Sequence, residues 1–112
     1  MVTGGWITRA DRARWQQQAA AELAAILAEH PGIPVIAWTV TASGGALSGQ
    51  VLAPAAGRRG LFTEWRQALG LDEATETASW NGTPVYLHAR GARGGVAVSI
   101  AATVFDDGED GR

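Results

Sequence analysis

The side chains best suited to acid–base chemistry near neutral pH are the two histidines, His30 and His88. His88 could join Ser99 and a carboxylate in a nucleophilic triad, but no serine stands in a GxSxG elbow. Because serines and carboxylates are common, such a trio arises easily by chance, and we expect no catalytic residues. His30 falls at the end of an expected helix, where the helix dipole favours positive charge. Capping therefore explains His30 more simply than metal binding does.

The sequence lacks the motifs that bind metals, cofactors and phosphates. It has no cysteine, no HExxH pair and no acidic loop with calcium-binding spacing. It also has no Walker-type phosphate loop and no GxGxxG turn. We therefore expect no metal ion and no cofactor. An anion site remains open at residues 57–60, where Arg58 and Arg59 precede a helix whose first N–H groups are free. A solvated loop is the simpler interpretation of these residues.

All nine basic residues are arginines, and most of them fall near two expected helices. They are Arg9, Arg12 and Arg14 beside the first helix, and Arg58, Arg59 and Arg66 beside the second. Aromatic side chains such as Trp80 and Tyr86 could stack on bases. However, residues 1–105 hold eight arginines and seven carboxylates, so their net charge is only +1. Nucleic-acid binding needs a marked basic excess and is therefore an alternative, not the leading interpretation.

A partner or ligand surface is expected on one face of a sheet. Residues 85–90 alternate apolar with polar side chains, so Tyr86, His88 and Arg90 share a face if the apolar set points to the core. Trp38 and Trp80 are strand residues whose faces the pattern does not assign. The candidate surface residues are Trp38, Trp80, Tyr86, His88 and Arg90. Exposed aromatic and apolar groups of this kind usually meet a partner.

Hydrophobic spacing predicts the elements that position these residues. Apolar side chains recur at helical steps after Thr8 or Asp11, either of which can cap the helix, and Pro31 ends it. Residues 33–41 and 46–52 predict a hairpin, and residues 61–69 predict a short helix with Gly70 as its left-handed cap. Asn81-Gly82 predicts a second hairpin, with strands over about 75–80 and 83–90. Strict alternation predicts the last strand over residues 96–105.

The predicted fold is α+β, in the order α-β-β-α-β-β-β. We expect an antiparallel sheet of about five strands with two helices packed on one face. The predicted core joins apolar side chains of both helices to one face of the last strand. Its members are Trp15, Leu23, Ile26, Leu27, Trp65, Leu69, Val96, Val98, Ile100 and Val104.

Three segments resemble small uncharacterised proteins of high-GC actinobacteria. The first is Ile33-Pro34-Val35-Ile36-Ala37-Trp38-Thr39-Val40, the second Trp65-Arg66-Gln67-Ala68-Leu69, and the third Ala101-Ala102-Thr103-Val104-Phe105-Asp106. The resemblance covers most of the chain. It carries no catalytic motif and implies no activity, cofactor or partner.

The composition is typical of one folded domain. The 112 residues are 46% hydrophobic and 18% charged, and disorder needs the opposite balance. We expect a single α+β domain over residues 1–105 and an acidic, flexible tail over residues 106–112. The absence of cysteine fits a reducing compartment, and we find neither a signal peptide nor a stretch that could span a membrane. A cytoplasmic location is therefore the expectation.

These observations favour a non-catalytic interaction module that forms a homodimer or serves another protein as an adaptor. Two helices can cover only one face of a five-stranded sheet, whereas residues 33–41 are apolar on both faces. Trp38 or Trp80 would anchor the dimer, or the last strand would pair edge to edge with its copy. A nucleic-acid accessory protein and a small-ligand-binding domain are the alternatives.

Overall fold

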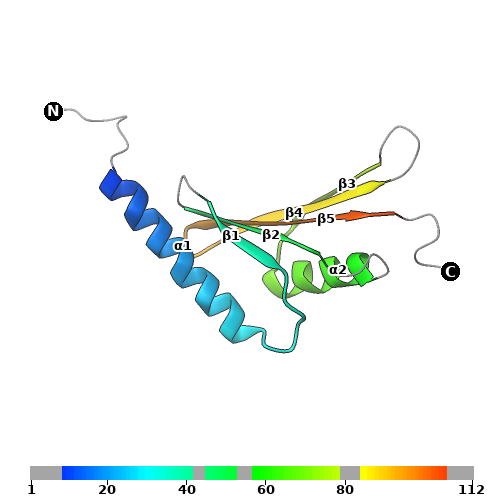
Figure 1. Ribbon diagram of the computed structural model, residues 1–112, viewed down its shortest axis with the longest axis horizontal. Helices are drawn as coiled ribbons and strands as arrows, with labels where there is room; N and C mark the ends of the chain where they lie inside the picture. The colour runs from blue at the N-terminus through cyan, green and yellow to red at the C-terminus, as the bar shows by residue number, and fades with distance from the viewer. Residues whose placement is uncertain (1–8, 42–44, 53–56, 79–83, 106–112) are drawn as a thin grey trace.

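The computed structural model describes residues 9–41, 45–52, 57–78 and 84–105. Two helices and five strands follow one another in the predicted order (Figure 1). They are α1 (Arg9–Glu29), β1 (Ala37–Val40), β2 (Ala46–Gln50), α2 (Arg58–Leu69), β3 (Glu73–Ala78), β4 (Val85–Arg93) and β5 (Val96–Val104). The α+β class and the order of elements are therefore confirmed.

The five strands form one mixed sheet in the order β1-β2-β5-β4-β3. Three neighbouring pairs are antiparallel, as predicted, but β2 and β5 run parallel, so the sheet is mostly antiparallel with one parallel pair. The parallel pair arises because α2 carries the chain from β2 to the far edge, and the β3-β4-β5 meander then returns to β2. As a result β5 lies in the middle of the sheet. Edge pairing by the last strand is thus ruled out, since the edges are β1 and β3.

Both helices lie on the same side of the sheet (Figure 1). The core fills the space between the helices and the sheet. The inward row of β5 is buried from Val96 to Val104, as its alternation predicted. Trp65 on α2 and Ile26 on α1 are also buried, while Leu23 and Leu69 pack against the core at its margin.

Two residues of the predicted core lie elsewhere. Leu27 is 43% exposed, and Trp15 is only half-buried and outside the core cluster. The reason is that α1 buries a narrow line through Ala19 and Ile26, two turns apart, so that Leu27 points away from the sheet. Because α1 is rich in alanine, its faces differ little in hydrophobicity, and the sequence pattern does not show which face is buried.

The ends of several elements differ from the predicted ones. β1 begins at Ala37 rather than residue 33, because Pro34 has no N–H to give to a strand ladder. α2 begins at Arg58 and ends at Leu69, and the φ of 65° at Gly70 confirms the left-handed cap. Trp80, the Asn81-Gly82 turn and the acidic tail lie outside the described residues. Within the described part of the chain, neither helix is long and apolar enough to cross a membrane.

Candidate protein-interaction surface

The face of the sheet opposite the helices carries the side chains that point away from the core. The registers align Thr39, Ser48, Ser99, Arg90 and Glu73 in one row across all five strands. This row is polar throughout and its side chains differ greatly in size. We call this helix-free surface the open face.

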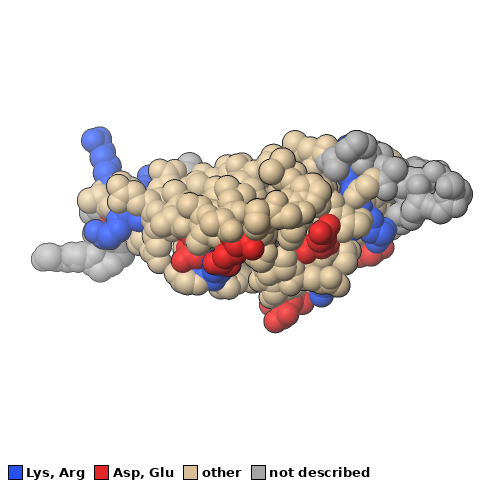
Figure 2. All heavy atoms as spheres, turned by 90° about the horizontal axis from the view of Figure 1, so that it is seen from below, with Lys and Arg blue, Asp and Glu red and all other residues tan. Residues whose placement is uncertain are grey.

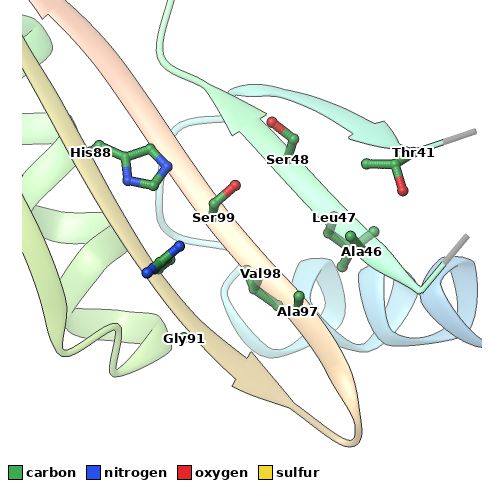
Figure 3. Close-up of a pocket in the computed structure, with 10 residues that line it drawn as sticks. Thr41, Ala46, Leu47, Ser48, His88, Gly91, Ala97, Val98 and Ser99 are labelled. Carbon is green, nitrogen blue, oxygen red and sulfur yellow. The ribbon is translucent and has the colours of Figure 1, made fainter. Parts of the chain in front are cut away.

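Side-chain size divides the open face into a floor and a ridge. The floor lies over β2 and β5 and consists of small side chains, namely Ala46, Ser48, Ala97, Ser99 and Ala101, and it ends at the larger Gln50, which pairs with Ala101. The ridge lies on the adjacent strand β4 and consists of Tyr86, His88 and Arg90, all exposed. Between them is a hollow of about 250 Å³ (Figure 3), on whose rim Ser48, Ser99 and His88 point to the same side.

One end of the open face is apolar. Tyr86 stands opposite Thr103, and Leu52, two residues beyond the Gln50–Ala101 pair, continues the outward row of β2. Phe105 directly follows Val104, the last residue of β5, and Val35 lies two residues before β1. Val35, Leu52, Tyr86 and Phe105 are all large exposed hydrophobic side chains, and we call them the apolar end. Such a gathering on one surface is typical of an interaction site.

The charges of the open face are paired with each other. Arg90 donates from Nε to Glu73 Oε1 at 2.7 Å, and the two side chains are directly opposite across β3 and β4. Both side chains are about two-thirds exposed, at 66% and 70%. Solvent-exposed pairs of this kind contribute little to stability, so another charged group can replace either partner at small cost.

His88 and Ser99, the histidine and serine of the conceivable triad, both line the hollow of the open face. His88 stands opposite Ala101 and only diagonal to Ser99, and among the described residues no hydrogen bond joins the two side chains. The same part of the chain contains no group of three or more metal-ligating side chains. The arrangement can offer shape, apolar area and hydrogen-bonding groups to a partner.

Trp38 is separated from the other candidate surface residues. The alternation predicted Tyr86, His88 and Arg90 on one face, and the structure places them together on the open face. Trp38 instead points to the helices, where its ring meets that of Trp65 edge to face at 5.8 Å. Trp38 therefore does not share the open face with Tyr86, His88 and Arg90. The reason lies in Gly49, which pairs with Trp38 and leaves room for the indole on the core side.

The arginines at the start of α2 make contacts within the chain. Arg58 donates to the Thr103 carbonyl oxygen at 2.9 Å, and Arg59 donates to Glu76 Oε1 at 3.2 Å. Arg66 donates to the Leu71 carbonyl oxygen at 3.1 Å. These bonds give the three side chains structural roles. The side seen in Figure 2 shows acidic and basic groups interleaved, with no dominant basic patch in its described part. These observations weaken the case for an anion site and for nucleic-acid binding through α2.

Sequence reasoning missed Val35, Leu52 and Phe105 as surface residues. The signal for each was alternation: Ile36 and Val51 are buried, so their neighbours Val35 and Leu52 point outward. Phe105 continues the outward row of the last strand. No protein-family model matches this chain, and no curated protein matches it.

Proposed function

We propose that this protein is a non-catalytic interaction module that pairs with a second copy of itself through the open face. The observation that carries the proposal is the ridge of large side chains on β4 beside the floor of small ones on β5. The apolar end supplies the apolar surface that becomes buried when two such faces meet.

A surface with a ridge next to a floor is complementary in shape to a second copy of itself. A two-fold axis between them places the ridge of each copy over the floor of the other, which is how symmetric dimers use one patch twice. Two packed sheets lie about 10 Å apart, and a floor of alanine and serine leaves room for Tyr86 and His88 within that distance. Arg90 and Glu73 of each copy carry opposite charges and pair with each other, so they bring no net charge to the interface.

A small-ligand site is the second candidate. The hollow between floor and ridge is lined by Ser48, Ser99, His88 and Arg90, which can all form hydrogen bonds to a polar ligand. The apolar end favours the dimer, since a small polar ligand would leave it exposed. A cytoplasmic location is part of the proposal, because a chain without cysteine suits a reducing compartment.

Light scattering coupled to size-exclusion chromatography tests the dimer. At micromolar concentration the wild-type mass should be twice 11.7 kDa. Leu52→Glu should raise the dissociation constant at least about 30-fold, because it places a charge in the apolar end of the interface. Leu52 is 64% exposed in the single chain, so the variant should fold normally.

Leu27→Glu is the matched control for Leu52→Glu. Leu27 is also an exposed leucine, but it lies on α1, on the other side of the sheet. This variant should keep the wild-type dissociation constant. A wild-type monomer at high concentration, or equal effects of the two glutamates, would contradict pairing through the open face.

A further inference from the structure

Helix α1 is attached to the sheet with little apolar burial. Of its 21 residues only Ala19 and Ile26 are buried, and the apolar residues Trp15, Leu23 and Ala25 are partly buried. The rest of the core belongs to α2 and the strands, with Trp65, Phe62 and Ile100 among its members. Removing α1 therefore leaves most of the core in place.

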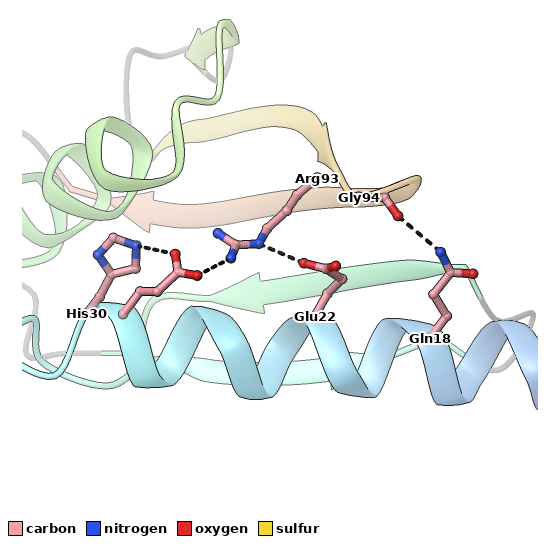
Figure 4. A network of polar contacts seen from close by, with 6 residues as sticks. Gln18, Glu22, His30, Arg93 and Gly94 are labelled. Atoms are coloured by element: carbon pink, nitrogen blue, oxygen red, sulfur yellow. Dashed lines mark hydrogen bonds and ion pairs between the residues drawn. The ribbon is translucent and has the colours of Figure 1, made fainter.

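Polar contacts hold α1 instead (Figure 4). At the end of β4, Arg93 donates from Nε to Glu22 Oε1 at 2.8 Å and from Nη2 to Glu29 Oε2 at 2.5 Å. One turn earlier on α1, Gln18 Nε2 donates to the carbonyl oxygen of Gly94 at 3.0 Å. Thus one guanidinium bridges two carboxylates that lie two turns apart on the helix, a geometry that suits the planar fork of arginine.

The clamp made by Arg93, Glu22 and Glu29 is accessible to water. The Glu29 side chain is 50% exposed and that of Arg93 is 29% exposed. Ion pairs at such positions are screened by salt and compete with hydration, so each one contributes little. A helix held in this way opens more easily than a helix held by a buried face.

We infer that α1 is a releasable cover, clamped by Arg93, that can leave the sheet while α2 and the five strands stay folded. Its release would uncover the apolar side chains of β1, β2 and β5 that it packs on. The open face lies on the opposite side of the sheet, so the inference does not depend on the proposed dimer.

Acid should open the clamp. The hydrogen bond from Arg93 lowers the pKa of Glu29 from its usual value of 4.5, and the charges of Arg93 and His30 act in the same direction. A lowered pKa means that Glu29 stabilises the docked helix above its ordinary pKa and loses this effect as the pH falls through the lowered pKa. Glu29 is faced by the charged Arg93 on β4 and by the titratable side chain of His30 after α1, whose Nε2 lies 3.9 Å from Glu29 Oε1. Glu22 faces the same guanidinium.

Hydrogen exchange of the full chain, followed by mass spectrometry at neutral pH, tests the cover. Arg93→Met should speed exchange in α1 about fivefold to tenfold while exchange in β5 stays at the wild-type rate. Arg59→Met is the matched control, because Arg59 also pairs with a glutamate but joins α2 to β3. It should leave α1 exchange unchanged.

Two outcomes would overturn the inference. One is equal acceleration of α1 and β5 in Arg93→Met, which would mean that α1 opens only when the whole chain unfolds. The other is wild-type exchange of α1 in Arg93→Met, which would mean that the clamp does not hold the helix. In support, wild-type α1 should also lose protection before β5 when the pH falls below the usual pKa of glutamate.

Discussion

Trp65→Ala should lower the free energy of unfolding by about 3–5 kcal/mol, the range measured when large aromatic side chains are deleted from cores. Trp65 is 1% exposed and is the largest buried side chain of the described residues. Its indole N–H donates to the Pro34 carbonyl oxygen at 2.9 Å, and its ring meets those of Trp38 and His30 edge to face. One side chain thus joins α2, β1 and the segment after α1.

Urea unfolding followed by circular dichroism measures this loss. A domain of this size has only about 5–15 kcal/mol of stability, so the midpoint should fall steeply while the slope changes little. Leu27→Ala is the control: because Leu27 is exposed, its truncation should change the free energy of unfolding by less than about 0.5 kcal/mol. A loss from Leu27→Ala as large as that from Trp65→Ala would show that α1 packs on the sheet through another face.

The order of elements could be predicted because local pattern determines each one. The alternation from Val96 to Val104 marks a strand with one buried face, and Gly70 marks the end of a helix. The sheet order could not be predicted in the same way. Nothing in the sequence of β2 or β5 specifies that the two strands pair in parallel, since that contact depends on the path of α2 across the sheet.

The candidate surface was predictable only in part, and the reason is again local. Alternation alone placed Tyr86, His88 and Arg90 on one face. It could not place Trp38, because β1 is apolar on both faces and burial depends on the partner strand. The floor also escaped prediction, since it exists only where the small residues of β2 lie beside those of β5.

Gly49→Ala should lower the free energy of unfolding by about 1–3 kcal/mol, as overpacking of a filled core usually does. A Cβ added at Gly49 would lie 2.8 Å from Ile36 Cδ1, 3.1 Å from Trp38 Cζ3 and 3.2 Å from Ile100 Cγ2. The isoleucine methyl at the end of a flexible side chain can move, but the indole is rigid and is held on its other side by Trp65. The added methyl therefore displaces Trp38 or pushes β2 from its partner.

Gly60→Ala is the matched substitution, and its expected effect on the free energy of unfolding has the opposite sign. Gly60 lies exposed within α2, and an added Cβ would meet no atom within 4 Å. Alanine there should raise the free energy of unfolding by about 0.5–1 kcal/mol, because glycine loses more backbone entropy in a helix. Urea midpoints of the two variants, measured side by side, give the comparison. If Gly49→Ala were as stable as the wild type, the space beside Gly49 would not be what places Trp38 on the core face.

Combining Gly49→Ala with Trp38→Leu extends the test to the pair itself. Trp38 and Gly49 are directly opposite in the β1–β2 register, so the two changes act on the same space. A leucine yields to the added methyl where the indole does not, and the double variant should lose less stability than the sum of the two single losses, by about 0.5–3 kcal/mol. Strict additivity would mean that the two residues are energetically independent, and the position of Trp38 would then need another cause.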